Sequence, residues 1–331
     1  ERSGKTLTVE VHAPKTTQAH YDLVRKMRAS ILCLGPLLTK YGQAQVSLPG
    51  GCAIGSRPIN LHLDGMKAMG AEIELREGYV HAYAKRLKGA SILFEFATVG
   101  GTENIMMAAT LAEGVTTIEN AAKEPEIVDL ANYLNKMGAK IEGAGSSIIR
   151  ITGVDRLTPA EHVVIADRIE AGTLLLAGAI SGGQVTVEKC VPSDLEALIA
   201  KMRESGFKVD TEKTAMTVYP CKSWKGVDVT TAPHPAFPTD LQAQFMAVTT
   251  IAEGTSVITE TVFENRFMHV TELSRLGADI TPKNRVAVVR GKPGGLTGAP
   301  VMATDLRASA SLVLAGLVAK GETVVNRIYH L

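Results

Sequence analysis

A repeat of about 70 residues runs through this sequence and limits the architectures that it can adopt. A helix-to-strand junction of the type Leu-Ala-Glu-Gly-x-Thr-x-Ile recurs at intervals of 67 to 72 residues, at Gly42, Gly114, Gly183, Gly254 and Gly321. A second junction, where a helix ends in Gly-Ala-x-Ile or a related sequence, recurs at Gly70, Gly138, Gly206 and Gly277. Because glycine readily adopts the left-handed conformation that ends many helices, each unit is predicted to read helix, strand, helix, strand and hairpin.

The two helices of each unit differ in how their apolar residues are distributed. The first kind is apolar on all sides, as in 173–180 and 312–318, and is expected to be buried all round. The second kind is amphipathic, and in 127–137 one face collects Ile127, Leu130, Ala131, Leu134 and Met137. The second kind of helix is therefore expected to pack on one side and to face water on the other.

Buried helices wrapped by sheets, with amphipathic helices outside, predict an α/β fold made of two inside-out α/β barrels. We expect residues 1–166 to form a first domain, which carries a cysteine loop, and residues 167–331 to form a second domain that is incomplete at its C-terminus. Six units in two groups of three would complete the two domains. The chain is therefore expected to be a fragment that lacks about one unit, divided between its two ends.

The charge balance and the cysteine spacing exclude several classes of protein. The chain has 35 Lys and Arg against 34 Asp and Glu, without long runs of one sign, which argues against nucleic acid or a membrane surface as the main partner. Its four cysteines are widely separated and lack the spacing of metal sites or of secreted disulfide scaffolds. No apolar stretch approaches the ~20 residues that cross a bilayer. These features indicate a cytoplasmic protein.

Polar residues begin the helices whose bodies are otherwise apolar. They occur in five segments: 28–30, 98–102, 167–170, 238–240 and 305–309. A helix N-terminus presents free N–H groups and a partial positive charge, so these positions favour phosphate or carboxylate, and arginine adds two-point recognition. For any single helix, ordinary N-capping by Thr98, Thr239, Asp240 or Asp305, with the arginines as surface charges, is the favoured explanation. The recurrence in five units favours anion sites that converge on one cleft.

Two residues are candidates for chemistry. Cys52 lies in a glycine- and proline-rich loop, 47–58, five residues before Arg57, whose positive charge favours a reactive thiolate. The alternative for Cys52 is a buried structural cysteine. Asp240 follows Pro238 and Thr239 at the start of a buried helix, where partial desolvation suits a general base. The alternative for Asp240 is an N-cap, and His234 and His269 receive no role.

Three long stretches carry a resemblance to a known family: 49–58, 231–240 and 303–310. They resemble the UDP-N-acetylglucosamine 1-carboxyvinyltransferases (MurA), which belong to the enolpyruvyl transferases, and the resemblance covers the whole chain. It implies transfer of the enolpyruvyl group of phosphoenolpyruvate to the 3'-hydroxyl of UDP-N-acetylglucosamine with release of phosphate. This reaction is the first committed step of peptidoglycan synthesis, in cell wall biogenesis, and it needs no metal or other cofactor.

The resemblance also implies roles for individual residues. Cys52 corresponds to the loop thiol that donates a proton and reacts with fosfomycin, and Asp240 corresponds to the base at the sugar hydroxyl. Arg57 corresponds to the arginine that neutralises the phosphate of phosphoenolpyruvate. The remaining positions expected to bind substrate are Arg28, Pro58, Ile59, Asn60, Leu61, Ala97, Thr98, Val99, Gly100, Val262, Asp305 and Arg307. For Arg28 and Arg307 a structural role is the alternative.

The chain also departs from the family pattern. A Lys-Asn pair near the N-terminus and an arginine after Tyr329-His330-Leu331, both parts of the family's active site, fall outside it, so this stretch alone is expected to be inactive. Phe96 stands where some members carry a lysine. Two other functions remain: a 3-phosphoshikimate enolpyruvyl transferase, which lacks the cysteine loop, and a non-catalytic paralogue that binds a nucleotide sugar.

Overall fold

The computed structural model describes residues 2–12, 14–25, 27–48, 59–303, 305 and 307–328. Contacts divide these residues into two compact units. Unit 1 comprises the described parts of Glu1–Gly50 and Pro58–Ala121 together with Leu130–His162, and unit 2 comprises Ala122–Asp129 and the described parts of Val163–Leu331.

Unit 1 contains two four-stranded sheets with the same topology. The first has the order β3 (Gln18–Ala19), β4 (Gln43–Ser47), β6 (Tyr79–Tyr83) and β5 (Glu72–Arg76), and the second has the order β7 (Ser91–Leu93), β8 (Val115–Glu119), β10 (Ile148–Thr152) and β9 (Lys140–Glu142). In both sheets the first pair of strands is parallel and the other pairs are antiparallel. A short hairpin pairs β1 (Arg2–Ser3) with β2 (Thr6–Leu7).

The helices of unit 1 follow the predicted two kinds. The buried helices are η1 (Arg28–Cys33), α2 (Leu34–Tyr41) and α4 (Val99–Ala109), and α1 (Tyr21–Val24) precedes them. The amphipathic helices are α3 (Asn60–Ala68) and α5 (Pro125–Lys136), and α5 begins among unit 2 residues and ends among unit 1 residues. Fully buried aliphatic and methionine side chains form the core between α2, α3 and α4, and they include Leu34, Leu38, Met66, Ile105 and Met106.

Unit 2 repeats the same arrangement with sheets of different completeness. The four-stranded sheet has the order β14 (Val229–Thr230), β15 (Gly254–Thr259), β17 (Val286–Gly291) and β16 (Asp279–Lys283). A three-stranded sheet has the order β11 (Val185–Glu188), β13 (Ala215–Val218) and β12 (Val209–Thr211), and β18 (Pro300–Met302) pairs in parallel with β19 (Val324–Asn326). Each smaller sheet therefore matches a part of the four-stranded order.

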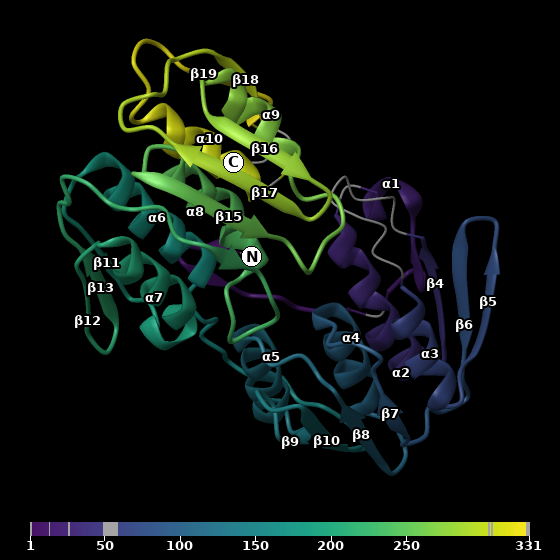
Figure 1. Ribbon diagram of the computed structural model, residues 1–331. Coiled ribbons are helices and arrows are strands. Elements are labelled where there is room, and N and C mark those ends of the chain that lie inside the picture. The colour runs from purple at the N-terminus through teal and green to yellow at the C-terminus, as the bar shows by residue number, and fades with distance from the viewer. Residues whose placement is uncertain are drawn as a thin grey trace. The chain divides into compact units, whose positions relative to one another are not determined.

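Three helices of unit 2 contact one another at its centre: α6 (Arg168–Ser181), α8 (Gln242–Thr249) and α10 (Ala308–Gly316). Sheets lie against them, with α8 under β15 and β17 and α6 under β11 and β13 (Figure 1). Helices of the amphipathic kind are α7 (Glu196–Ser205) and α9 (Met268–Arg275), and short turns η2 (Pro192–Leu195) and η3 (Thr239–Leu241) precede α7 and α8. The inside-out α/β prediction is confirmed.

Two details of the sequence prediction need correction. The left-handed glycine after α6 is Gly182, not Gly183, because the helix ends one residue earlier than the repeat suggested. Burial on all sides holds for α8, where every residue is buried, but not for α6 and α10. Leu174 and Val313 are 49% and 40% exposed, because the smaller sheets next to these helices cover less of their surface within the described chain.

Candidate functional site

Asp240 lies in unit 2, within η3 and directly before α8. The segment before it contains Pro235, joined to His234 by a cis peptide bond, and Pro238. Neither η3 nor α8 receives a side-chain hydrogen bond at its N-cap, so capping, the alternative role for Thr239 and Asp240, is wrong. The Asp240 carboxylate accepts a hydrogen bond from Nη2 of Arg266 at 2.5 Å instead.

Arg266 is a residue of this site that sequence reasoning left without a role. Its side chain is 5% exposed, and its Nη1 donates to the Thr239 hydroxyl at 2.8 Å while Nη2 reaches Asp240. The guanidinium also lies 5.0 Å from the centre of the Phe263 ring. A planar guanidinium with both ends engaged fixes the carboxylate that it holds. No local motif marks Arg266, since it is 26 residues from Asp240 in the chain.

Val262 is close to this pair in the turn that follows β15. Its backbone N–H donates to Oε1 of Glu260 at 2.8 Å, and the N–H of Phe263 donates to the same oxygen at 3.1 Å. Glu260 also accepts from the Thr239 hydroxyl at 2.8 Å. The structure thus connects two predicted site residues, Asp240 and Val262, through hydrogen bonds to neighbouring side chains.

The start of α10 brings Asp305 and Arg307 together. Oδ1 of Asp305 accepts from the backbone N–H groups of Arg307 and Ala308 at 2.8 and 3.0 Å, so Asp305 acts as a capping residue. Nη2 of Arg307 lies 3.1 Å from Oδ2 of Asp167, the N-cap of α6. Burial raises the pKa of Asp167, but the N–H of Glu170 and the charge of Arg307 outweigh it and lower the pKa overall. Arg307 therefore neutralises Asp167 at the junction of two helix starts.

In unit 1 the candidate residues meet where α4 begins. Thr98 is the N-cap, with its hydroxyl accepting from the N–H of Gly101 at 3.2 Å, so the capping role is correct at this position. Ala97 precedes the cap, and Val99 and Gly100 form the first turn. A capped helix start still presents N–H groups that can bind an anion.

A second helix start, that of α3, lies against this turn. Ile59 is its N-cap residue and Asn60 and Leu61 open the helix. His62 follows, and its ring atoms Cε1 and Nε2 lie 3.2 and 3.5 Å from where a Cβ at Gly100 would be. His62 is 6% exposed. No sequence motif marks His62, apart from its position next to the predicted segment 57–61.

Asn104 fixes the ring of His62. Its side-chain oxygen accepts from the Gly35 N–H at 2.8 Å, so its amide nitrogen is the donor to Ile31 O and to Nδ1 of His62, at 3.1 and 3.0 Å. Nδ1 therefore accepts, and a neutral His62 carries its proton on Nε2. Burial, with the nearby charge of Arg28 at the start of η1, lowers the pKa of His62 to about 4. The imidazole is neutral at pH 7.

Several predicted residues lie outside the described part of the chain. Cys52, Arg57 and Pro58 are among them, so their predicted roles remain predictions. Two of the described cysteines, Cys33 and Cys190, differ from a reactive thiol. Burial raises the pKa of both Cys33 and Cys190, which keeps them protonated near neutral pH.

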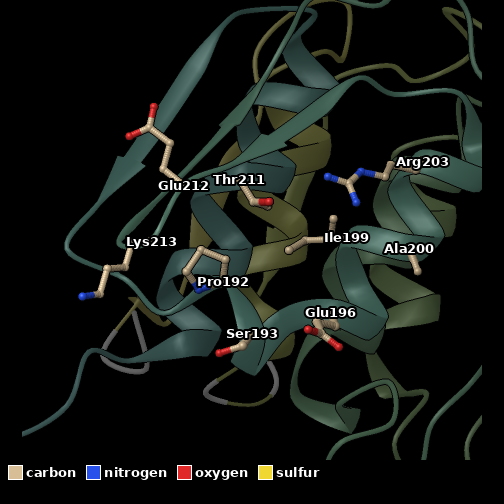
Figure 2. A pocket seen from close by; sticks show the side chains of 9 residues that line it. All are labelled: Pro192, Ser193, Glu196, Ile199, Ala200, Arg203, Thr211, Glu212 and Lys213. Atoms are coloured by element: carbon tan, nitrogen blue, oxygen red, sulfur yellow. The ribbon is translucent and has the colours of Figure 1, made fainter.

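A surface pocket of about 520 Å³ lies elsewhere in unit 2 (Figure 2). It lies between η2 with α7 on one side and the β12–β13 hairpin on the other, and Figure 2 shows Glu212 and Lys213 extending away from the helix. Arg203 on its wall is already engaged by Val209 O, at 3.1 Å from Nε and 2.6 Å from Nη2. None of the predicted site residues lines this pocket, so it is not the candidate site.

Among the described residues, no group of three or more His, Cys, Asp or Glu side chains is arranged to hold a metal ion. Within the same residues, no helix combines the length and apolar character needed to span a bilayer.

Comparison with known proteins identifies relatives over the whole chain. The family model for EPSP synthase (3-phosphoshikimate 1-carboxyvinyltransferase) matches residues 1–331. The chain is 75% identical to a UDP-N-acetylglucosamine 1-carboxyvinyltransferase of Bdellovibrio bacteriovorus over 99% of the chain and 79% of that protein. It is 58% identical to the enzyme of the same name from Myxococcus xanthus, over 100% of the chain and 79% of that protein.

A solved structure agrees with these relatives. The crystal structure of the enolpyruvyl transferase NikO from Streptomyces tendae superposes with a TM-score of 0.84 at 27% identity, and the match covers 96% of this chain and 75% of that chain. The family match, the identities and the shared fold lead to one conclusion: the chain belongs to the EPSP synthase family of enolpyruvyl transferases and groups with its UDP-N-acetylglucosamine 1-carboxyvinyltransferases.

Proposed function

We propose that this protein transfers the enolpyruvyl group of phosphoenolpyruvate to the 3'-hydroxyl of UDP-N-acetylglucosamine and releases phosphate. The observation that carries the proposal is 75% identity, over 99% of the chain, to a relative named for this reaction. The reaction would serve peptidoglycan synthesis and thereby cell wall growth, cell shape and cell division. Both substrates are small soluble molecules, so the place of action would be the cytoplasm.

The chemistry requires one acid and one base. A proton is added to the methylene carbon of phosphoenolpyruvate, the sugar oxygen forms a bond to the adjacent carbon, and its own proton is removed. Loss of phosphate, with a proton from the new methyl group, restores the double bond. Cys52 would supply the first proton and Asp240 would accept the hydroxyl proton. Asp240 suits this role because Arg266 holds it while 39% of its side chain stays exposed.

Anion binding would use the helix starts of each unit. In unit 1, the first turn of α4 from Thr98 to Gly100 and the His62 Nε2–H offer donors for the diphosphate of the nucleotide sugar. In unit 2, Arg307 would neutralise charge in the bound substrates, and Asp305 would hold its backbone. Arg57 would bind the phosphate of phosphoenolpyruvate.

Phosphate release tests the proposal. The full-length protein is incubated with phosphoenolpyruvate, with and without UDP-N-acetylglucosamine, and compared with its Cys52→Ala variant. We expect release only when both substrates are present, and a collapse of the rate in the variant. Release with 3-phosphoshikimate in place of the nucleotide sugar would identify the other family activity. Tight nucleotide-sugar binding without any release would identify a non-catalytic paralogue.

A further inference from the structure

Glu260 is a buried carboxylate at the end of β15 that the proposed reaction does not use directly. The residue is 1% exposed, and four hydrogen-bond donors surround its two oxygens. Oε1 accepts from the Thr231 hydroxyl and from the N–H groups of Val262 and Phe263, at 2.9, 2.8 and 3.1 Å. Oε2 accepts from the Thr239 hydroxyl at 2.8 Å. A buried carboxylate with this many donors is fixed in one orientation.

The hydroxyl of Thr239 transmits this orientation. A hydroxyl has a single proton, and in Thr239 this proton is directed at Glu260, so only its lone pairs remain for Nη1 of Arg266. Thr231 behaves in the same way, because its hydroxyl donates to Glu260 and accepts from the Thr261 N–H at 3.0 Å. Glu260 therefore determines the donor direction of both threonine hydroxyls.

The hydrogen-bond chain ends at the proposed base. Arg266 donates through Nη1 to the Thr239 hydroxyl, which fixes the guanidinium, and donates through Nη2 to Oδ1 of Asp240. The same Glu260 holds the backbone at Val262, a predicted substrate contact. One buried side chain thus links the proposed base, through Thr239 and Arg266, to the Val262 turn that follows β15.

Among the residues that directly follow β4, β8, β11, β15 and β19, Glu260 is the one with a carboxylate. The residues that directly follow β8, β11 and β19 are Asn120, Lys189 and Arg327, and all three have a left-handed backbone with φ between 56° and 58°. Glu260 follows β15 at the corresponding place without a positive φ, as Leu48 does after β4. Asn120 donates a hydrogen bond to Phe94 O at 3.0 Å, whereas Glu260 accepts from two threonine hydroxyls and two backbone amides.

We infer that Glu260 is a positioning residue that orients Asp240 for proton removal through Thr239 and Arg266, and that it fixes the Val262 turn for the same substrate. This inference rests on the proposed function. A glutamine at position 260 keeps the shape but replaces one accepting oxygen with a donor, so it cannot accept at both ends. Either the Thr239 hydroxyl or the two backbone amides would then face a donor.

Four variants of the full-length protein test this inference: Glu260→Gln, Thr239→Val, Thr239→Ser, and Glu260→Gln combined with Thr239→Val. Thr239→Val removes the connecting hydroxyl and keeps the volume, and Thr239→Ser restores the hydroxyl. We expect Glu260→Gln and Thr239→Val each to lower kcat about 10- to 100-fold. Because both break one chain, the double variant should be no slower than the slower single variant, and Thr239→Ser should stay near the unmodified rate.

The matched control is Glu272→Gln, another buried glutamate of unit 2, which accepts from the Met302 N–H at 2.9 Å. It should lower the melting temperature and leave kcat unchanged. Unchanged kcat in Glu260→Gln, or effects of the two single variants that multiply, would overturn the inference. If Glu260→Gln does not fold, the kcat values of Thr239→Val and Thr239→Ser test the inference, and an unchanged kcat in Thr239→Val would overturn it. An unmodified protein that releases no phosphate would overturn the proposed function, and this inference with it.

Discussion

Arg266 and Asp240 form an ion pair whose two partners differ in exposure. Nη2 of Arg266 lies 2.5 Å from Oδ1 of Asp240, and the arginine side chain is 5% exposed whereas the aspartate side chain is 39% exposed. Arg266, the buried partner, also donates to Thr239 and is therefore fixed, whereas Asp240 remains accessible. A carboxylate that a buried arginine orients, and whose side chain is still partly exposed to solvent, is suited to accept a proton from a bound substrate.

Replacing Asp240 with asparagine distinguishes a role in proton removal from a role in stabilising the fold. The amide oxygen can still accept from Arg266, so the fold should keep its stability, whereas the base is lost and kcat should fall about 10²- to 10⁴-fold. Phosphate release and thermal unfolding measure the two effects. Asp279→Asn is the control, because Asp279 pairs with Arg290 at 3.1 Å on the exposed surface. A variant that keeps its kcat would remove Asp240 from the proton-transfer step.

Gly100→Ala tests whether the start of α4 binds the nucleotide sugar. A methyl group there would lie 3.2 Å from Cε1 of His62, closer than ordinary contacts, and would crowd the first turn without touching the Thr98 cap. We expect KM for UDP-N-acetylglucosamine to rise about tenfold at unchanged kcat, since only binding is weakened. Gly183→Ala is the control, because its methyl would meet Ser181 Oγ at an ordinary 3.5 Å. If KM is the same in both variants, the start of α4 does not bind the nucleotide sugar, and the role of Thr98 is helix capping alone.

The repeat allowed much of the fold to be predicted, because a 70-residue period with glycine at its helix ends describes local structure. Left-handed φ values at Gly42, Gly70, Gly138 and Gly206 bear this out. The exposure of Leu174 could not be predicted, since it depends on how many strands the neighbouring sheet contains and not on the helix sequence.

The candidate site was less predictable because its support comes from distant residues. Capping was equally plausible for Thr98 and Thr239 from sequence, and only the structure distinguishes them: Thr98 caps α4, and Thr239 donates to Glu260. Arg266 and Glu260 lie in a segment whose residues look like ordinary surface charges. Their burial follows from the packing of the turn after β15 against η3, which no local pattern records.

Alkylation by fosfomycin should distinguish the cysteines. Cys33 and Cys190 have thiols whose pKa is raised by burial, so little thiolate is available to attack the epoxide. Cys52, in its glycine-rich loop near Arg57, is expected to be the modified residue, and bound substrates should protect it. Peptide mapping by mass spectrometry after a short exposure measures this. Modification of Cys221 or Cys33 at the same rate as Cys52 would contradict the assignment.

The buried His269 predicts how stability changes with pH. Burial lowers the pKa of His269 to about 4 from the ordinary value of 6.5, and Arg266 acts in the same direction. Between these pH values the unfolded chain binds a proton that the folded protein does not, so stability is fully present above pH 6.5 and is lost as pH falls towards 4. The loss is limited to about 3 kcal/mol for one such group.

Replacing His269 with leucine should remove this dependence. Neither ring nitrogen of His269 has a hydrogen-bond partner within the described residues, so an apolar side chain of similar size leaves no described polar group unsatisfied. Urea unfolding at a series of pH values should show the slope of unfolding free energy between pH 6.5 and 4 reduced by up to about 1.4 kcal/mol per pH unit. His12→Gln, which changes an exposed histidine, should leave the slope unchanged. An equal slope in His269→Leu would mean that this imidazole is protonated in the folded protein, and the acid sensitivity would then have to come from His62 or from the carboxylates.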